Sequence, residues 1–169
     1  VAYFLSQLTL ILLFVLDLYN INVPTQYLFQ GQIEVSHLSV MLHLAMYLIV
    51  FLTFSYTLQY LEQNQKIAFG EYYVLTLLSL LGAMILVEAN NLLLLYAGLE
   101  LMSLPMYALI AIKRYSAYAV ESAAKYFVLG AIASGFLLYS ISFIYGLTGS
   151  INISTIQAFF SQHPEMLVH

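Results

Sequence analysis

The segment from Leu92 to Ile112 is a run of 21 almost wholly apolar residues that contains one carboxylate, Glu100. A helix rises about 1.5 Å per residue, so a run of this length can cross a hydrocarbon layer of about 30 Å. A charge at the centre of a bilayer costs about 2.5 to 3.5 kcal/mol on insertion scales, so it usually faces a protein partner or a water path. The run therefore predicts a membrane-spanning helix in which Glu100 is a candidate functional residue.

The composition extends this interpretation to the whole chain. Hydrophobic residues make up 63% of the sequence, charged residues 7%, and the mean hydropathy is +0.91, which is typical of an integral membrane protein. Four Lys and Arg stand against eight Asp and Glu, which excludes a basic surface for nucleic acid. The chain has no cysteine, so it can hold no thiolate nucleophile and no cysteine-ligated iron–sulfur cluster. We expect no metal site and no cofactor site.

The predicted fold class is all-α, a polytopic transmembrane helix bundle in one membrane domain, residues 1–169. Polar breaks, among them a tight turn at Glu88, Asn90 and Asn91, divide the chain into apolar segments. The five predicted spans are about 1–19, 36–60, 72–87, 91–112 and 117–146. Residues 20–35, 61–71 and 113–116 are predicted as loops, and the polar tail 147–169 as containing a short interfacial helix at 154–162.

Basic loop residues predict the orientation. Lys66 lies in the second loop, and Lys113 and Arg114 lie in the fourth, so all three fall on one side of the membrane. That side is the cytoplasm, or the matrix in a mitochondrion.

A polar stripe surrounds Glu100 on its predicted helix. Tyr96, Ser103 and Tyr107 lie four residues before, three after and seven after it, and so share its face. Pro105 lacks a backbone donor and predicts a helix kink beside the carboxylate. The stripe favours a proton relay, and the alternative is a glutamate that a neighbouring helix satisfies for packing specificity.

Lys125 follows Glu121 by four residues inside the last predicted span, and two interpretations remain open. One is a local helix pair near the interface, worth a few tenths of a kcal/mol. The other is a buried proton-relay lysine, because lysine seldom enters a span without a function. Since Lys125 and Glu100 flank the same short loop, we expect them at similar depth, within reach of each other directly or through one water molecule.

His43 lies about two turns into the second span, with Ser39 and Tyr47 four residues to either side. It is a candidate proton carrier, although such a histidine is more often a hydrogen-bonded contact between helices. Asp17 and Glu88 lie at span ends, where snorkelling or turn formation accounts for them.

Small residues recur in the last span, and they predict close helix packing without chemistry. They are Gly130, Ala131, Ser134 and Gly135.

Three motifs carry a family resemblance: GLELMSLPMY, SAYAVESAAKYFVLGAIASG and IYGLTGS. With their surroundings, from Glu71 to Gln157, they resemble the central part of subunit 2 of NADH:ubiquinone oxidoreductase, respiratory complex I, an antiporter-like membrane-arm subunit. The resemblance implies that Glu100 and Lys125 belong to a proton-translocating charge chain. It further implies a proton half-channel coupled to NADH oxidation and quinone reduction.

The same resemblance implies the surroundings of the chain. NADH, FMN, iron–sulfur clusters and ubiquinone are expected in other subunits, and the partners are other membrane-arm subunits and lipid. The expected location is the mitochondrial inner membrane, with the bacterial plasma membrane as the alternative. Members of the family continue for many more spans, so we expect a fragment, a shortened subunit, or one half of a split gene whose other half is a separate chain. Two other functions remain open: a scaffold subunit that does not pump, and a subunit of a cation/proton antiporter complex.

Overall fold

A computed structural model describes residues 1–22, 24–63 and 69–163, without the side chains of residues 61–63 and 69. Its elements follow the chain as α1 (Ala2–Tyr19), β1 (Gln26–Leu28), β2 (Ile33–Val35), α2 (His37–Gln63), α3 (Phe69–Glu88), α4 (Leu92–Ile110), α5 (Ala117–Thr148) and α6 (Ile153–Gln162). Helices α1 to α5 are each long and apolar enough to cross a membrane, which confirms five predicted spans.

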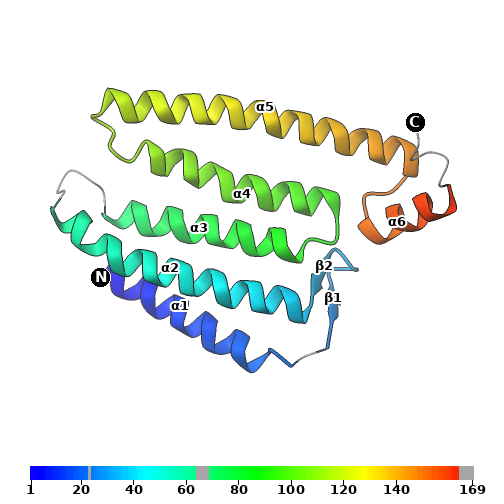
Figure 1. Ribbon diagram of the computed structural model, residues 1–169, viewed down its shortest axis with the longest axis horizontal. Helices are drawn as coiled ribbons and strands as arrows, with labels where there is room; N and C mark the ends of the chain where they lie inside the picture. The colour runs from blue at the N-terminus through cyan, green and yellow to red at the C-terminus, as the bar shows by residue number, and fades with distance from the viewer. Residues whose placement is uncertain (23, 64–68, 164–169) are drawn as a thin grey trace.

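The helices lie roughly antiparallel in chain order, with α1 beside α2 and α3 at one side of the bundle and α5 beside α4 at the other (Figure 1). Helices α3 and α4 form the closest pair. A Cβ atom on Gly82 would collide with the backbone of Met102, and one on Gly98 would lie 2.8 Å from the backbone nitrogen of Leu86. Glycine at these two positions therefore permits the backbones of α3 and α4 to approach each other.

The predicted turn between these helices is present, and it is tied to two other segments. Asn91 caps α4 by accepting a hydrogen bond from the backbone N–H of Leu93 at 2.8 Å, and its own amide donates to Asn152 at 3.2 Å. The N–H of Asn90 donates to the carbonyl of Gln32 at 2.9 Å. Backbone and amide hydrogen bonds thus tie the segments together at this end of the bundle.

The 20–35 segment is not a simple loop. Strands β1 and β2 pair antiparallel, with Gln26 opposite Val35, and the chain reverses through Phe29, Gln30 and Gly31, all of which have positive φ. Three-residue strands are too short to show an alternating pattern, which is why the sequence did not reveal the hairpin.

Two other boundaries differ from the prediction. Helix α2 continues to Gln63 and α3 begins at Phe69, so most of the predicted 61–71 loop is helical. Hydropathy marks where an apolar segment ends, whereas polar helix formers such as glutamate and glutamine continue a helix beyond it. The predicted helix at 154–162 is present as α6.

The buried core lies between α1, α2 and α3, where aromatic rings meet edge to face, as Phe54 and Tyr73 do with centroids 4.9 Å apart. Its buried members are Leu10, Tyr47, Phe54, Tyr73 and Leu80. Helix α5 differs, since it packs on α4 and leaves most of its length exposed, including Leu129, Phe136 and Leu147. Such a surface needs lipid or another protein to cover it.

Candidate functional site

Glu100 is half-buried where α4 faces α5. The hydroxyl of Ser134, on α5, donates a hydrogen bond to the Glu100 carboxylate and lies 3.1 Å from the hydroxyl of Tyr96, one turn back on α4. The interior acid therefore accepts a hydrogen bond from one hydroxyl, and that hydroxyl in turn contacts a second one. Tyr96 is thus linked to the acid only through Ser134, a residue that we expected to serve packing alone.

The other members of the predicted stripe do not reach the carboxylate. The hydroxyl of Ser103 donates to the carbonyl of Leu99 in its own helix, at 2.7 Å. The hydroxyl of Tyr107 lies where a Cβ atom on Gly130 would be, so this glycine makes room for the tyrosine against α5. Pro105 is buried, and α4 continues through it to Ile110.

Lys125 lies away from Glu100. Its side chain is 71% exposed, and its ammonium group pairs with Glu121 at 2.5 Å, as in the local helix pair considered from the sequence. Nine residues separate Lys125 from Ser134 on α5, which corresponds to about 13 Å along the axis and about half a turn around it. The expected contact between Lys125 and Glu100 is therefore absent, because Lys125 faces outward from the described bundle.

A second polar cluster lies at the other side of the bundle, and the sequence did not reveal it. His43, with only 4% of its side chain exposed, places Nδ1 3.5 Å from an Asp17 carboxylate oxygen and 3.7 Å from one of Glu88. The hydroxyl of Tyr47 donates to Asp17 at 3.0 Å. Four residues from α1, α2 and α3 thus form what we call the histidine cluster: Asp17, His43, Tyr47 and Glu88.

The local structure explains why this cluster forms. His43 and Tyr47 are four residues apart on α2 and share a face. Asp17 lies near the end of α1 and Glu88 is the last residue of α3, and antiparallel packing brings both ends beside the start of α2 (Figure 1). Asp17 and Glu88 lie at span ends as predicted, but they also face His43, which snorkelling or turn formation does not explain, and His43 makes a contact between helices.

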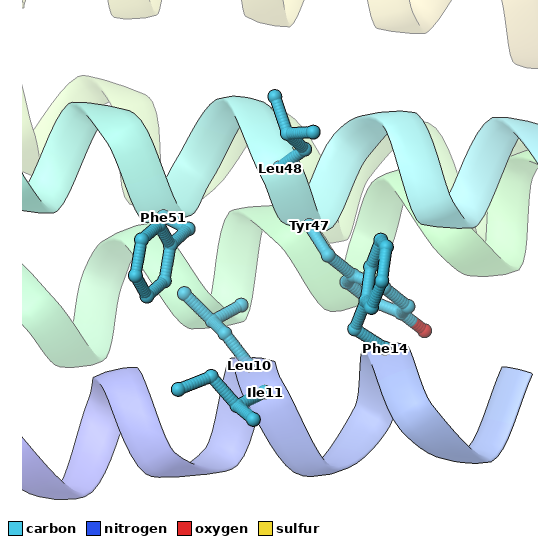
Figure 2. Close-up of a pocket in the computed structure, with 6 residues that line it drawn as sticks. All are labelled: Leu10, Ile11, Phe14, Tyr47, Leu48 and Phe51. Carbon is cyan, nitrogen blue, oxygen red and sulfur yellow. The ribbon is translucent and has the colours of Figure 1, made fainter. Parts of the chain in front are cut away.

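Two cavities lie on either side of Tyr47 along α2. The first has a volume of about 190 Å³ and lies between α1 and α2 (Figure 2). Its lining is apolar and consists of Leu10, Ile11, Phe14, Tyr47, Leu48 and Phe51. This cavity offers no polar atom for an ordered ligand and is typical of a surface that an acyl chain or an apolar side chain covers.

The second cavity has a volume of about 220 Å³ and is bordered by the histidine cluster. Its titratable lining residues are Asp17, His43 and Glu88. The rest of the lining comes from the chain between α1 and α2 and from the start of α2: Asn20, Pro24, Gln26, Val35, Ser36 and Val40. The cavity therefore lies at the hairpin end of the bundle.

The opposite end carries the basic loop residues. Arg114 pairs with Glu71, and the ammonium group of Lys113 donates to the Tyr60 hydroxyl at 2.7 Å. Lys66, which also entered the orientation prediction, lies outside the described residues. Lys113 and Arg114 thus lie at the end of the bundle away from the histidine cluster (Figure 1).

Comparisons with known proteins relate this arrangement to a family. Residues 89–168 match the family model described as NADH:quinone oxidoreductase/Mrp antiporter, transmembrane. The chain is 46% identical over 92% of its length to NADH-quinone oxidoreductase subunit N of Herminiimonas arsenicoxydans, and 43% identical over 97% to that of Coxiella burnetii. These alignments cover 32% and 35% of the two relatives, so the chain spans about a third of their length.

Solved structures show the same arrangement of helices. A chain in respiratory complex I from Thermus thermophilus with bound Aureothin superposes with a TM-score of 0.74 and 31% identity, over 89% of this chain and 32% of that one. A chain of the membrane-bound sulfane sulfur reductase, an archaeal respiratory membrane complex, superposes with a TM-score of 0.72 and 26% identity, over 91% and 32%. The chain is therefore a multi-pass membrane protein with the antiporter-like fold, homologous to subunit N of NADH-quinone oxidoreductases.

Proposed function

We propose that this chain forms part of a membrane-arm subunit of a proton-pumping NADH:quinone oxidoreductase, in which Glu100 takes up and releases protons within a half-channel. The observation that carries the proposal is the half-buried Glu100 carboxylate between α4 and α5, which accepts a hydrogen bond from Ser134, whose hydroxyl also contacts that of Tyr96. A hydroxyl group can both donate and accept hydrogen bonds, so Ser134 can stay bonded to the acid in its neutral and its charged form.

The redox chemistry belongs to other subunits in this proposal. NADH, FMN, iron–sulfur clusters and ubiquinone bind there, and this chain contributes proton transfer alone. The curated relatives above are bacterial, which supports the bacterial plasma membrane over the mitochondrial inner membrane as the location. Other membrane-arm subunits cover the exposed length of α5.

Lys125 can take part in the proposed proton transfer only together with a group that lies outside the described bundle. It is exposed on the outer face of α5, so a group that exchanges charge with it has to come from outside the described bundle. An adjoining subunit, or a further part of this one, seated on α5 supplies such a group.

Glu100→Gln tests the proposal because it keeps the size and hydrogen bonding of the side chain and removes its titration. We expect NADH-driven proton pumping by the purified complex in vesicles to fall by about tenfold or more, since positioned proton-transfer groups contribute about 10²- to 10⁴-fold in catalysis. The amount of assembled complex should stay unchanged. Lys125→Met, in parallel, tests the outward lysine.

Glu71→Gln is the matched control, because Glu71 is a surface carboxylate near the start of α3 that pairs with Arg114. Normal pumping in a fully assembled Glu100→Gln complex would contradict the proposal and leave the chain as a scaffold. A second candidate, a subunit of a cation/proton antiporter complex, is favoured by the description of the family model. Copurification with flavin and iron–sulfur subunits distinguishes the first candidate from the second.

A further inference from the structure

The function proposed for Glu100 does not involve the cavity beside the histidine cluster, which is large and lined partly by polar groups. Its volume of about 220 Å³ has room for several water molecules, each of which occupies about 30 Å³ in the liquid. It is bordered by two carboxylates and an imidazole, as well as by the side chains of Asn20, Gln26 and Ser36. A polar cavity of this size is suited to ordered water.

His43 provides a second and independent observation. Its side chain is 96% buried and lines the cavity, and its Nε2 atom makes no hydrogen bond to any described residue. A buried polar nitrogen without a partner costs free energy unless water or a ligand satisfies it. The imidazole therefore needs an exchangeable partner from the cavity.

The charged groups around His43 indicate which kind of ligand this site binds. Asp17 faces it from α1 and Glu88 from α3, while Tyr47 of α2 donates to Asp17. The remaining cavity residues, from the chain between α1 and α2 and the start of α2, carry no titratable group. No group of three or more histidine and acidic residues among those described has the arrangement of a metal site, so an imidazole between two carboxylates favours a proton.

We propose that the histidine cluster is a second proton-binding site, at the hairpin end of the bundle, in which His43, Asp17 and Glu88 exchange a proton with water in the cavity. The imidazole accepts a proton from hydronium on the half-channel side, and a neutral water molecule is left there. It then passes a proton to either carboxylate, so the imidazole returns to neutral and the carboxylate becomes a carboxylic acid. The acid finally returns its proton to water, and no electron transfer is involved.

The depth of the histidine cluster in the bundle, and the end at which it lies, indicate its role in proton transfer. His43 lies six residues into α2, about 9 Å from the start of the helix, whereas Glu100 lies about 12 Å into α4. The basic residues Lys113 and Arg114 lie at the other end, so the positive-inside rule directs the cavity away from the cytoplasm. The inference rests on the proposed function, since it makes this cavity the place where the half-channel meets the outer water.

The test uses the purified complex in vesicles, with His43→Gln and with Asp17→Asn combined with Glu88→Gln. We expect pumping per assembled complex to fall on the order of tenfold, less than the 10²- to 10⁴-fold contribution of positioned groups in catalysis, because water still reaches the cavity. The fold-loss should increase as the pH on the cavity side falls, since release of protons to that water is then opposed and a group that passes protons on matters more. Glu34→Gln, a carboxylate of β2 outside the cavity lining, should leave both the rate and its pH profile unchanged.

Two further measurements separate proton binding from packing. Asp17→Glu keeps a carboxylate and should restore pumping to within about twofold, because a positioned acid acts through its protonation state. The infrared band of a protonated carboxyl group should weaken in Asp17→Asn and in Glu88→Gln. Unchanged pumping and an unchanged band would overturn the proposal, and so would a loss of assembly that leaves pumping per assembled complex normal.

Glu100→Gln in the same preparation keeps the two proposals apart. If it lowers pumping while the cluster variants pump normally, only this inference fails. If Glu100→Gln pumps normally, the proposed function fails.

Discussion

The Glu100 site and the histidine cluster are built in opposite ways. Glu100 accepts a hydrogen bond from Ser134 on the next helix along the chain, and Ser134 also contacts Tyr96 on the helix of Glu100. His43 is met by carboxylates from two other helices, 26 residues before it and 45 residues after it. The comparison teaches that a lone charge in the middle of a span is visible in a sequence, whereas a site assembled from the ends of several spans is not.

The two sites also differ in what surrounds them. The histidine cluster borders a cavity that lies at the end of the bundle, and His43 itself is buried. Glu100 lies deeper along its helix, against α5, whose other faces are exposed. The cluster is therefore complete within α1, α2 and α3, while the Glu100 site depends on what covers α5. The close α3–α4 pair joins the two.

The largest effect is expected from a substitution that disrupts the packing of α3 against α4. In Gly82→Ala the new methyl group meets the backbone of Met102, and overpacking of this kind costs about 1 to 3 kcal/mol. We expect the assembled complex to fall about tenfold, as measured by its amount in solubilised membranes. Gly135→Ala makes the same chemical change where nothing lies within 4 Å, so equal loss in both variants would show that the α3–α4 contact is not the cause.

A substitution with a smaller expected effect distinguishes the Glu100 site from the histidine cluster. Ser134→Ala removes the hydroxyl that donates to Glu100, and hydrogen bonds to charged groups are worth about 1.5 to 3 kcal/mol. We expect pumping to fall several-fold with normal assembly, and the pH profile that belongs to the histidine cluster to persist. Ser140→Ala is the control, because that hydroxyl donates to the carbonyl of Phe136 in its own helix. An equal fall in both would argue against a specific role for the Glu100 contact.

The substitutions with the smallest expected effect test which end of the bundle faces the cytoplasm. The chain has no cysteine, so Tyr115→Cys and Tyr27→Cys each introduce one unique thiol, at positions that are 92% and 62% exposed. Substitutions at such surfaces usually change stability by less than about 0.5 kcal/mol. A membrane-impermeant maleimide should label Tyr115→Cys from the cytoplasmic side and Tyr27→Cys from the other. The reverse pattern would place the histidine cluster at the cytoplasmic end.

Particular residues show how far prediction from the sequence reached. Glu100 and Tyr96 were identified because both follow from the composition and period of one helix. Ser134 was assigned to packing because a small residue on an apolar helix carries no sign of the acid on the neighbouring helix. Lys125 was expected beside Glu100 because depth follows from sequence position, but the direction in which a side chain points around the helix axis does not.

The sequence by itself therefore determined the five spans and their approximate ends, because these are properties of short segments, and it left the pair of Glu121 with Lys125 as one of two interpretations. Only the tertiary structure decided that Asp17, His43 and Glu88 meet, that Ser134 faces Glu100, and that Lys125 points outward. The physical reason is that these helices are apolar on nearly all sides, so no hydrophobic face orients them. Their rotation about their axes is set by close packing against one another, as where Gly82 and Gly98 bring α3 against α4.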